Sequence, residues 1–401
     1  MEPKYYTIEQ HLISPEQVDK HAYFLVRKLH ENGFAAYIVG GWIRDSLMGK
    51  PPKDFDISTS AKPEEIKALF RNCILIGKRF RLAHVRFGKK ILEVATFRTG
   101  DVENASLILQ DNDYGTEKDD VLRRDFTING LFYDLETDTI IDYVGGYSDA
   151  KKRILRTIGP PHARFCQDPV RMLRLLKFQA RFNLSVEKKT MQALKDCRKN
   201  IIKSSQARIF EEILRMLESG FAAPFIHNLA KYRFLELLLP DLEDKILDYI
   251  LCFLQIADEE TAREHLSRPL LLSCLSYPLF VHNVQDASEE SPPTLHEIAA
   301  IASKTTEQIF SPFFQIPRKM KGAMTYILTS QCRFTPIQDR PGRRLRIPFD
   351  EALPSALKFL EMRAKLQPDL SAVYQKIKKL SSSVLSRRLR KPRKTAHGKN
   401  R

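Results

Sequence analysis

Asp54 and Asp56, two aspartates two residues apart, are the residues whose type and spacing point most directly to chemistry. Side chains two positions apart on a strand project from one face, so both carboxylates would point together while Phe55 points into the core. Paired negative charges need a cation, and Mg²⁺ takes a few carboxylates together with waters and substrate phosphates. Two such ions could activate a hydroxyl and steady a leaving pyrophosphate. Two ordinary acids on a solvated turn are the alternative.

The segment before this pair has the pattern of a phosphate-binding turn. The run 36–39 is rich in β-forming residues and leads into Gly40 and Gly41. A strand followed by glycines and a helix lets backbone amides approach phosphate oxygens, and Arg44 adds positive charge. A tight turn that needs a positive φ would explain the glycines equally well, and neither the P-loop nor the dinucleotide-binding glycine pattern occurs. Because Asp54 follows Gly41 by only thirteen residues, we favour a nucleotide cradle.

A third cluster, Arg123-Arg124-Asp125, stands just before an apolar segment. Arg124 could hold triphosphate or ribose oxygens through its bidentate guanidinium. Asp125 could complete the set of carboxylates, although Glu93, in a strand pattern, competes for that position. The alternative is a helix start in which Asp125 is a capping acid and Arg123 is solvated.

A fourth cluster follows at the first long helical segment, where polar residues recur every three positions. This spacing places them on one slowly drifting face of a helix. An adjacent Asp and Arg offer acceptors and donors to the edge of a base, and later cations could meet phosphates. Taken alone, such a stripe is more often an exposed face. The stripe consists of Asp168, Arg171, Arg174 and Lys177.

The elements that would position these residues change in type along the chain. The front third alternates β-rich runs with glycines and one amphipathic helical segment, which predicts a mixed α/β domain. From about residue 164 onward, apolar residues recur with helical periodicity, which predicts a nearly all-helical remainder. Six cysteines are scattered singly, so we interpret them as reduced small side chains. No apolar run is long enough to span a membrane and no secretory signal is present, so we expect an intracellular, cytoplasmic protein without a membrane partner.

The charge of the chain favours a polyanionic partner. Its 65 Lys and Arg against 49 Asp and Glu give a net charge of +16. Eight of these cations fall in the last fifteen residues, 387–401, without an acid among them. A solvated basic end that aids solubility is the alternative.

Together and in this order, the clusters make the sequence resemble the family of bacterial poly(A) polymerases and CCA-adding tRNA nucleotidyltransferases, within the polymerase-β-like superfamily. The resemblance runs from about residue 35 to about residue 240. The motifs that carry it are GGWIRD at 40–45, DFD at 54–56, RRDFTIN at 123–129, DYVGG at 142–146 and DPVRMLR at 168–174.

This resemblance implies an α+β N-terminal nucleotidyltransferase domain, with a small mixed sheet and helices, followed by a mostly α-helical region. It also suggests how the chain is divided. We expect a catalytic head over 1–160, a helical neck over 161–240 that binds the nucleotide base and RNA, a helical RNA-binding body over 241–380, and a basic disordered tail over 381–401.

The resemblance further implies roles for individual residues. Asp54 and Asp56 would bind the catalytic Mg²⁺ ions, and Asp125 would be a third active-site acid. Gly40 and Lys177 complete the set of nucleotide-binding residues that we predict. The others, by resemblance, are Gly41, Arg44, Arg124 and Arg174 for the incoming nucleotide, with Asp168 and Arg171 on its base. Two residues depart from the family pattern: Gln167 replaces the usual Glu, and Lys177 replaces the Arg that is frequent in CCA-adding members.

Two activities occur within this family. The stretch LIGKRFRLAHV at 75–85, the segments 93–98 and 205–217, and the basic C-terminus resemble the poly(A) polymerase branch. We therefore predict a template-independent poly(A) polymerase that adds AMP from ATP to the 3′ ends of mRNA or other transcripts and releases pyrophosphate. A CCA-adding enzyme acting on tRNA is the alternative. A catalytically silent RNA-binding protein is less favoured, because the aspartates are intact.

Overall fold

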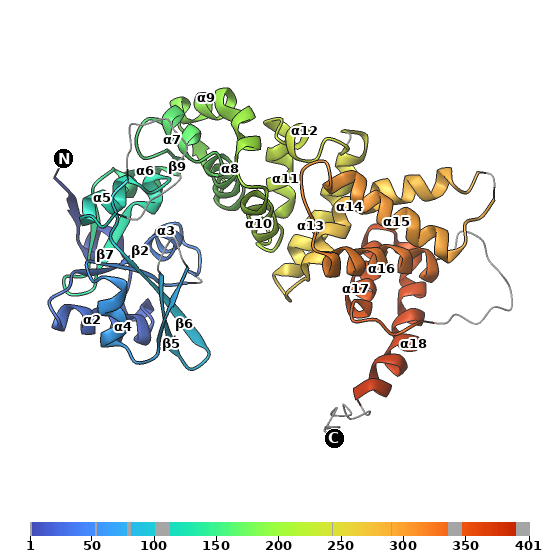
Figure 1. The fold of residues 1–401 in the computed structure, drawn as a ribbon, viewed down its shortest axis with the longest axis horizontal. Coiled ribbons are helices and arrows are strands. Elements are labelled where there is room, and N and C mark those ends of the chain that lie inside the picture. The colour runs from blue at the N-terminus through green and yellow to red at the C-terminus, as the bar shows by residue number, and fades with distance from the viewer. Residues whose placement is uncertain are drawn as a thin grey trace, which may run out of the picture. The chain divides into compact units, whose positions relative to one another are not determined.

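The computed structural model describes residues 2–52, 54–77, 82–100, 113–242, 244–289, 291–335 and 347–389. The chain divides into two compact units, residues 1–204 and residues 205–401 (Figure 1). Unit 1 combines a mixed sheet with helices, and the described part of unit 2 is helical. The predicted fold class, an α+β domain followed by a mostly helical region, is therefore confirmed.

Unit 1 is built around an eight-stranded sheet with the strand order β1-β8-β7-β2-β3-β6-β5-β4. Strands β3 and β6 are parallel, and the other neighbouring strands are antiparallel. The elements of this unit are β1 (Lys4–Tyr6), α1 (Ile8–His11), η1 (Pro15–Gln17), α2 (Lys20–Glu31), β2 (Ala36–Val39), α3 (Gly41–Leu47), β3 (Asp56–Thr59), α4 (Pro63–Leu69), β4 (Cys73–Ile76), β5 (Leu82–Phe87), β6 (Lys90–Thr96), α5 (Glu117–Leu122), η2 (Thr127–Asn129), β7 (Leu131–Asp134), β8 (Thr139–Asp142), α6 (Gly146–Lys152), β9 (Ile154–Leu155), α7 (Pro161–Gln167), α8 (Val170–Phe182), β10 (Ser185–Val186), α9 (Lys188–Cys197) and η3 (Arg198–Lys203).

The sheet is covered on both faces, as the alternation of side chains along its central strands requires. On one face, Ile38 of β2 packs with Trp42 of α3, and α2 and α4 continue this layer over the neighbouring strands. On the other face, Val39 of β2 packs with Val121 of α5. Asp56 lies on this second face because it pairs with Val39 in the register of β2 and β3.

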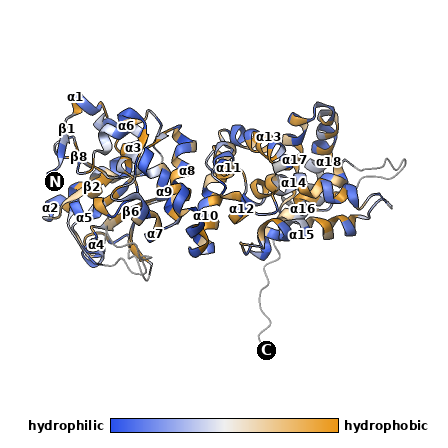
Figure 2. Ribbon diagram, turned by 90° about the horizontal axis from the view of Figure 1, so that it is seen from above, coloured by the Kyte–Doolittle hydropathy of each residue, from blue (hydrophilic) through white to orange (hydrophobic). Residues whose placement is uncertain are grey.

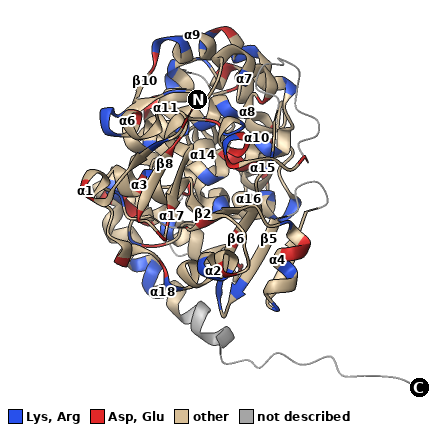
Figure 3. Cartoon of the chain, turned by 90° about the vertical axis from the view of Figure 1, so that its left-hand side faces the viewer, with Lys and Arg blue, Asp and Glu red and all other residues tan. Residues whose placement is uncertain are grey.

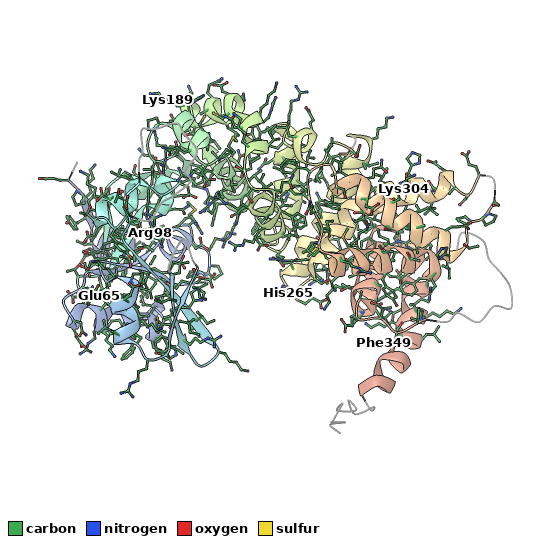
Figure 4. All side chains as sticks on the ribbon, in the orientation of Figure 1. Glu65, Arg98, Lys189, His265, Lys304 and Phe349 are labelled. Carbon is green, nitrogen blue, oxygen red and sulfur yellow. The ribbon has the colours of Figure 1, made fainter. Side chains whose placement is uncertain are left out.

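Local signals fix the ends of several helices. Helix α4 begins at Pro63, and Glu65 accepts a hydrogen bond from the Lys62 backbone amide at 2.6 Å (Figure 4). Figure 3 shows the acidic residues of α4, which favour the N-terminal end of a helix. In α2, the Asp19 carboxylate accepts from two backbone amides at the start of the helix.

Unit 2 consists of helices that bury their apolar faces against one another. Figure 2 shows hydrophobic residues on α13, α14 and α16, which line this helical core. Helix α10, for example, buries Ile209, Ile213 and Leu217, which recur at helical spacing. The elements are α10 (Gln206–Leu217), α11 (Ala222–Lys231), α12 (Leu235–Leu238), α13 (Asp244–Thr261), α14 (Arg268–Asp286), α15 (Leu295–Phe310), α16 (Arg318–Phe334), α17 (Leu353–Leu366), η4 (Pro368–Leu370) and α18 (Ser371–Leu389).

The C-terminal helix extends further than the sequence predicted. A disordered tail was expected from residue 381, whereas α18 continues to Leu389. Its serines are accommodated because Ser381 Oγ donates to the Ile377 carbonyl at 2.8 Å and Ser382 Oγ donates to the Lys379 carbonyl at 2.7 Å. The rest of the predicted tail, 390–401, and residues 78–81 of the LIGKRFRLAHV stretch lie outside the described residues. Among the described helices, none is both long and apolar enough to cross a membrane.

Candidate active site

The turn between β2 and α3 places two glycines close to a carboxylate and to guanidinium groups. Gly40 adopts φ +69°, a conformation that favours glycine. A Cβ atom at Gly40 would lie 3.6 Å from Arg124 Nη1 and 3.9 Å from Asp56 Oδ2. Gly41 is the first residue of α3, and a Cβ there would lie 3.5 Å from Arg44 Nη2. The glycines therefore leave open backbone beside two guanidinium groups and one carboxylate.

Three carboxylates gather at the start of β3. Asp56 is its first residue and pairs with Glu93 in the parallel register of β3 and β6. Burial, followed by the charges of Glu93 and Asp54, raises the pKa of Asp56 to about 6, while Arg124 and Arg44 oppose this rise. The acids therefore repel one another more than the nearby arginines compensate, and a bound cation would relieve that repulsion. This charge balance fits a divalent metal ion.

Asp54 does not share a strand with Asp56, contrary to the sequence prediction. Strand β3 begins only at Asp56, because its partner β2 ends opposite at Val39, where the chain turns at Gly40. Asp54 is exposed just before the strand. Phe55 is half-buried, and its ring centroid lies 5.6 Å from that of Trp42.

Arg124 is held in place beside the glycine turn. Its Nη2 donates to Asp120 Oδ2 at 2.7 Å and to Ser58 Oγ at 3.0 Å. Its Nη1 donates to the Asn129 carbonyl at 3.3 Å. Asp120 is fully buried and also pairs with Arg123 at 2.7 Å, and the two arginines help lower the pKa of Asp120 against the effect of burial. Arg124, which the sequence analysis predicted, is therefore oriented by Asp120, which it did not predict.

Asp125 forms an ion pair with an arginine of α8. Its Oδ2 lies 2.7 Å from Arg174 Nη2, and its Oδ1 accepts from Asn129 Nδ2 at 2.9 Å. Although burial opposes ionisation, Arg174 and these hydrogen bonds keep the pKa of Asp125 below its usual value. Two residues are candidates for a third carboxylate. The charge of Glu93 acts on Asp56, whereas Asp125 is paired with an arginine.

Arg44 is buried within the protein. Its Nε and Nη2 donate to Asp45 Oδ1 at 2.8 and 2.6 Å, and its Nη1 donates to Asn129 Oδ1 at 2.7 Å. The guanidinium also lies 4.7 Å from the ring centroid of Phe178 on α8. Asp45 Oδ2 in turn lies 2.7 Å from Arg181, so Asp45 joins α3 to α8. Burial lowers the pKa of Arg44 despite the neighbouring carboxylate.

Asn129 connects these groups, and sequence reasoning missed its role. Its backbone carbonyl accepts from Arg124, its side-chain oxygen accepts from Arg44, and its side-chain amide donates to Asp125. It is the last residue of the RRDFTIN motif, and Asp45 is likewise the last of GGWIRD. Membership of a motif was therefore the signal that could have identified both. Asp120 could have been identified from its position four residues before Arg124, a spacing at which ion pairs often form.

The stripe on α8 faces the 123–125 segment. Arg171 is buried and donates from Nη2 to the Arg123 carbonyl at 2.9 Å, and Arg174 pairs with Asp125. Asp168, between α7 and α8, and Lys177, on α8, are half-buried. The alternative of an exposed polar face therefore does not apply to Arg171.

Arg164 on α7 holds the same segment from the other side. It is fully buried, and its Nη2 donates to the backbone carbonyls of Leu122, Arg123 and Arg124. Its Nη1 donates to Gln167 Oε1 at 2.9 Å. Gln167, the departure from the family pattern, is therefore a neutral acceptor that orients a buried arginine.

Solved structures with the same architecture define the class of protein. The structure matches the CCA-adding enzyme of Bacillus stearothermophilus in complex with CTP, with a TM-score of 0.62 and 26% identity over 92% of this chain and 83% of that chain. It also matches a tRNA nucleotidyltransferase complexed with a primer tRNA and an incoming ATP analog, with a TM-score of 0.59 and 26% identity over 89% of this chain and 99% of that chain. The protein is a nucleotidyltransferase.

Comparisons of sequence give the family. The model of the poly(A) polymerase head domain matches residues 36–156, and that of the probable RNA- and SrmB-binding site of polymerase A matches residues 183–246. Poly(A) polymerase I of Salmonella typhi is 33% identical over 90% of this chain and 81% of its own length. That of Haemophilus influenzae is 38% identical over 77% of this chain and 72% of its own length. The CCA-adding enzyme of Enterococcus faecalis is 39% identical, but over 52% of each chain. The chain belongs to the poly(A) polymerase family.

Proposed function

We propose that this protein is a template-independent poly(A) polymerase that transfers AMP from ATP to RNA 3′ ends and releases pyrophosphate. The observation that carries the proposal is the extent of the similarity. It covers 90% of the chain and 81% of the relative for a poly(A) polymerase I, against about half of each chain for a CCA-adding enzyme. The similarity to poly(A) polymerases therefore includes the helical unit 2 as well as unit 1.

In this proposal, Asp54, Asp56 and Glu93 hold Mg²⁺. Bound there, Mg²⁺ would promote ionisation of the RNA 3′-hydroxyl and offset the charge of the triphosphate. The raised pKa of Asp56 supports this assignment, because burial and then the charges of Glu93 and Asp54 disfavour its negative charge in the absence of a cation. We propose Glu93 in place of Asp125 as the third ligand. Asp125 would instead position Arg174 through their ion pair.

The nucleotide would be bound on the same face of the sheet. Backbone amides at Gly40 and Gly41 would donate hydrogen bonds to phosphate oxygens, and Arg124 would contribute its charge. Arg44 would act mainly by positioning, because Asp45 and Asn129 already occupy its donors. Arg174 and Lys177 would stabilise phosphates from α8.

Choice of base would fall to the start of α8. We propose that Asp168 and Arg171 read the edge of adenine, since no template specifies the incoming nucleotide. Arg171 is anchored to the Arg123 carbonyl, which fixes its guanidinium beside the 123–125 segment. Such a fixed donor would discriminate between bases more sharply than a mobile one.

RNA would be bound by residues beyond the catalytic head. The family model that covers 183–246 is described as a probable RNA-binding site, and basic side chains occur on α8 and α10 (Figure 3). We propose RNA contacts in the neck, 161–240, and the body, 241–380, with the basic end of the chain adding charge. We also propose that the protein acts in the cytoplasm. Its six cysteines are free thiols, as expected in a reducing compartment.

A primer-extension assay tests the function. Purified protein with Mg²⁺ is given an oligo(A) primer or a tRNA that lacks its CCA end, with ATP alone, CTP alone, or both. A long ladder with ATP alone is expected on the primer. Extension of tRNA by three nucleotides that requires both CTP and ATP would instead identify a CCA-adding enzyme, the second candidate, which the 39% identity to such an enzyme over half the chain keeps open.

A pair of aspartate variants tests the metal assignment in the same assay. Asp56→Asn should reduce turnover by about three orders of magnitude or more, because it removes a proposed metal ligand. Asp196→Ala, which changes an exposed aspartate on α9, should leave turnover unchanged. Retained activity in Asp56→Asn, with both variants folded, would refute the assignment.

A further inference from the structure

Three side chains that commonly bind metals converge on α7 and α9, and none of the three has a role in the proposed transfer of AMP. His162 and Cys166 lie one helical turn apart on α7, and Cys197 is the last residue of α9. Figure 1 shows the two helices side by side. We call His162, Cys166 and Cys197 the His-Cys-Cys cluster; one ring nitrogen of the histidine and the two sulfurs all lie within 4.8 Å of one another.

Two distances within the cluster are close to the edges of a tetrahedral coordination site. Cys166 Sγ lies 3.8 Å from His162 Nδ1 and 3.9 Å from Cys197 Sγ. Zinc binds thiolate at about 2.3 Å and imidazole at about 2.0 to 2.1 Å, which separates neighbouring ligand atoms by about 3.6 to 3.8 Å in a tetrahedron. The two distances are therefore within a few tenths of an ångström of those in a zinc site, and the third, between His162 and Cys197 Sγ, is at most 4.8 Å. A disulfide would require the sulfurs to approach to about 2.05 Å.

The surroundings leave room for a fourth ligand. His162 is exposed, Cys166 is half-buried and Cys197 is buried, so the cluster runs from the surface inward and solvent can reach its outer side. Asn200 on η3 places its side-chain amide 3.5 Å from Cys166 Sγ. Two thiolates and a neutral imidazole carry two negative charges, which a divalent cation balances. Soft sulfur ligands select zinc-like ions over Mg²⁺.

We propose that the His-Cys-Cys cluster binds one thiophilic divalent cation of the Zn²⁺ class, with water as its fourth ligand. The ion joins α7 to α9. Helix α7 also carries Arg164, whose guanidinium donates to the backbone carbonyls of residues 122–124. By fixing α7, the ion also stabilises the position of this segment. The single cysteines along the sequence gave no such indication, because Cys166 and Cys197 are thirty-one residues apart and form no Cys-x-x-Cys pair.

Cobalt substitution tests the proposal directly. The full-length protein is reduced, treated with a chelator and titrated with Co²⁺ under anaerobic conditions. We expect one equivalent of Co²⁺ to produce the absorption of thiolate-to-cobalt charge transfer in a tetrahedral site, and added Zn²⁺ to abolish it. Carboxylates such as Asp54 and Asp56 cannot produce this charge-transfer band, so Co²⁺ bound at the proposed active site does not interfere.

Matched variants assign the signal to the cluster. Cys166→Ser should lose the charge-transfer band, whereas Cys252→Ser, which changes an exposed cysteine on α13, should keep it. His162→Ala should weaken Co²⁺ binding by about tenfold or more, as loss of one ligand of three implies. Because His162 is exposed, this variant tests the site even if Cys166→Ser does not fold. Circular dichroism spectra report on folding.

Three results would overturn the proposal. The first is the absence of the band in the unaltered protein, and the second is its persistence in both Cys166→Ser and His162→Ala. The third is a count of four thiols in place of six in the denatured protein purified anaerobically, which would indicate a Cys166–Cys197 disulfide. The readout does not depend on nucleotidyl transfer. A protein that binds Co²⁺ here but extends no RNA would support the site and contradict the proposed function.

Discussion

Gly40 matters to the candidate active site because it has no side chain to fill the space beside Arg124 and Asp56. An alanine there would be strained at φ +69° and would place Cβ between Arg124 and Asp56. We expect Gly40→Ala to cost about 1 to 3 kcal/mol of stability and to lower turnover by about 10²-fold. Gly49 is the matched control, since it has φ +68° but nothing within 4 Å of its would-be Cβ. Gly49→Ala should show the stability loss in urea denaturation while its turnover is unchanged. An equal loss of turnover in both variants would contradict the role of the cradle.

Asn129 is the second residue whose side chain can be tested alone. It accepts from Arg44 and donates to Asp125, and removing both bonds leaves two buried charges under-solvated. Asn129→Ala should lower the free energy of unfolding by about 3 kcal/mol, because hydrogen bonds to charged groups are the stronger kind. It should also lower kcat/KM for ATP by about tenfold or more. Asn32→Ala, which removes only an exposed hydrogen bond to the Lys28 carbonyl, should cost less than about 1 kcal/mol and leave kcat/KM unchanged. Unchanged kcat/KM in Asn129→Ala would show that Arg44 does not need this partner.

At the scale of elements, one carboxylate joins two helices of unit 2. Glu260 on α13 is buried and pairs with Lys358 and Lys365 on α17. Although burial opposes ionisation, the two lysines lower the pKa of Glu260 to about 2. A lowered pKa contributes stability above the unfolded-state value of about 4.3, and that stability is lost as the pH falls toward 2.

Glu260→Gln should therefore destabilise the protein by about 3 kcal/mol at pH 7, because it removes the charge of the buried carboxylate that pairs with Lys358 and Lys365. Urea denaturation measures this loss. Between pH 7 and about pH 2.5, the difference from the unaltered protein should shrink as Glu260 is protonated. Glu264→Gln is the control, because this carboxylate also contacts Lys358 but is 55% exposed, and it should cost less than about 1 kcal/mol. A pH-independent difference for Glu260→Gln would exclude the charge mechanism.

Elements were predictable from the sequence where their signals are local. Alternation and helical periodicity indicated the mixed sheet and the helical remainder, and the glycine turn followed from Gly40. The sequence could not show which of Glu93 and Asp125 lies beside Asp56 on the sheet, because the pairing of Glu93 with Asp56 depends on the parallel register of β3 and β6. The anchoring of Arg171 to the Arg123 carbonyl depends likewise on packing between elements distant in sequence. The His-Cys-Cys cluster was missed for the same reason.

At the scale of the whole molecule, the net charge of +16 should control RNA binding. Each cation that neutralises a phosphate of single-stranded RNA contributes about 0.7 to the slope of log K against log salt. Deleting residues 390–401 leaves helix α18 intact and removes six cations, so the slope should flatten by up to about 4. Those six cations are Arg390, Lys391, Arg393, Lys394, Lys399 and Arg401.

Binding of oligo(A) RNA measured at several salt concentrations checks this expectation. A variant that keeps the length but carries glutamine at the six positions should behave like the deletion, because the effect is one of charge. Extension of a short primer should continue in both variants, since the proposed active site lies in unit 1, while product length at moderate salt should fall. Equal slopes for the deletion and the full chain would show that the cations near RNA lie within residues 1–389 instead, which carry the remaining net charge of 16 − 6 = +10.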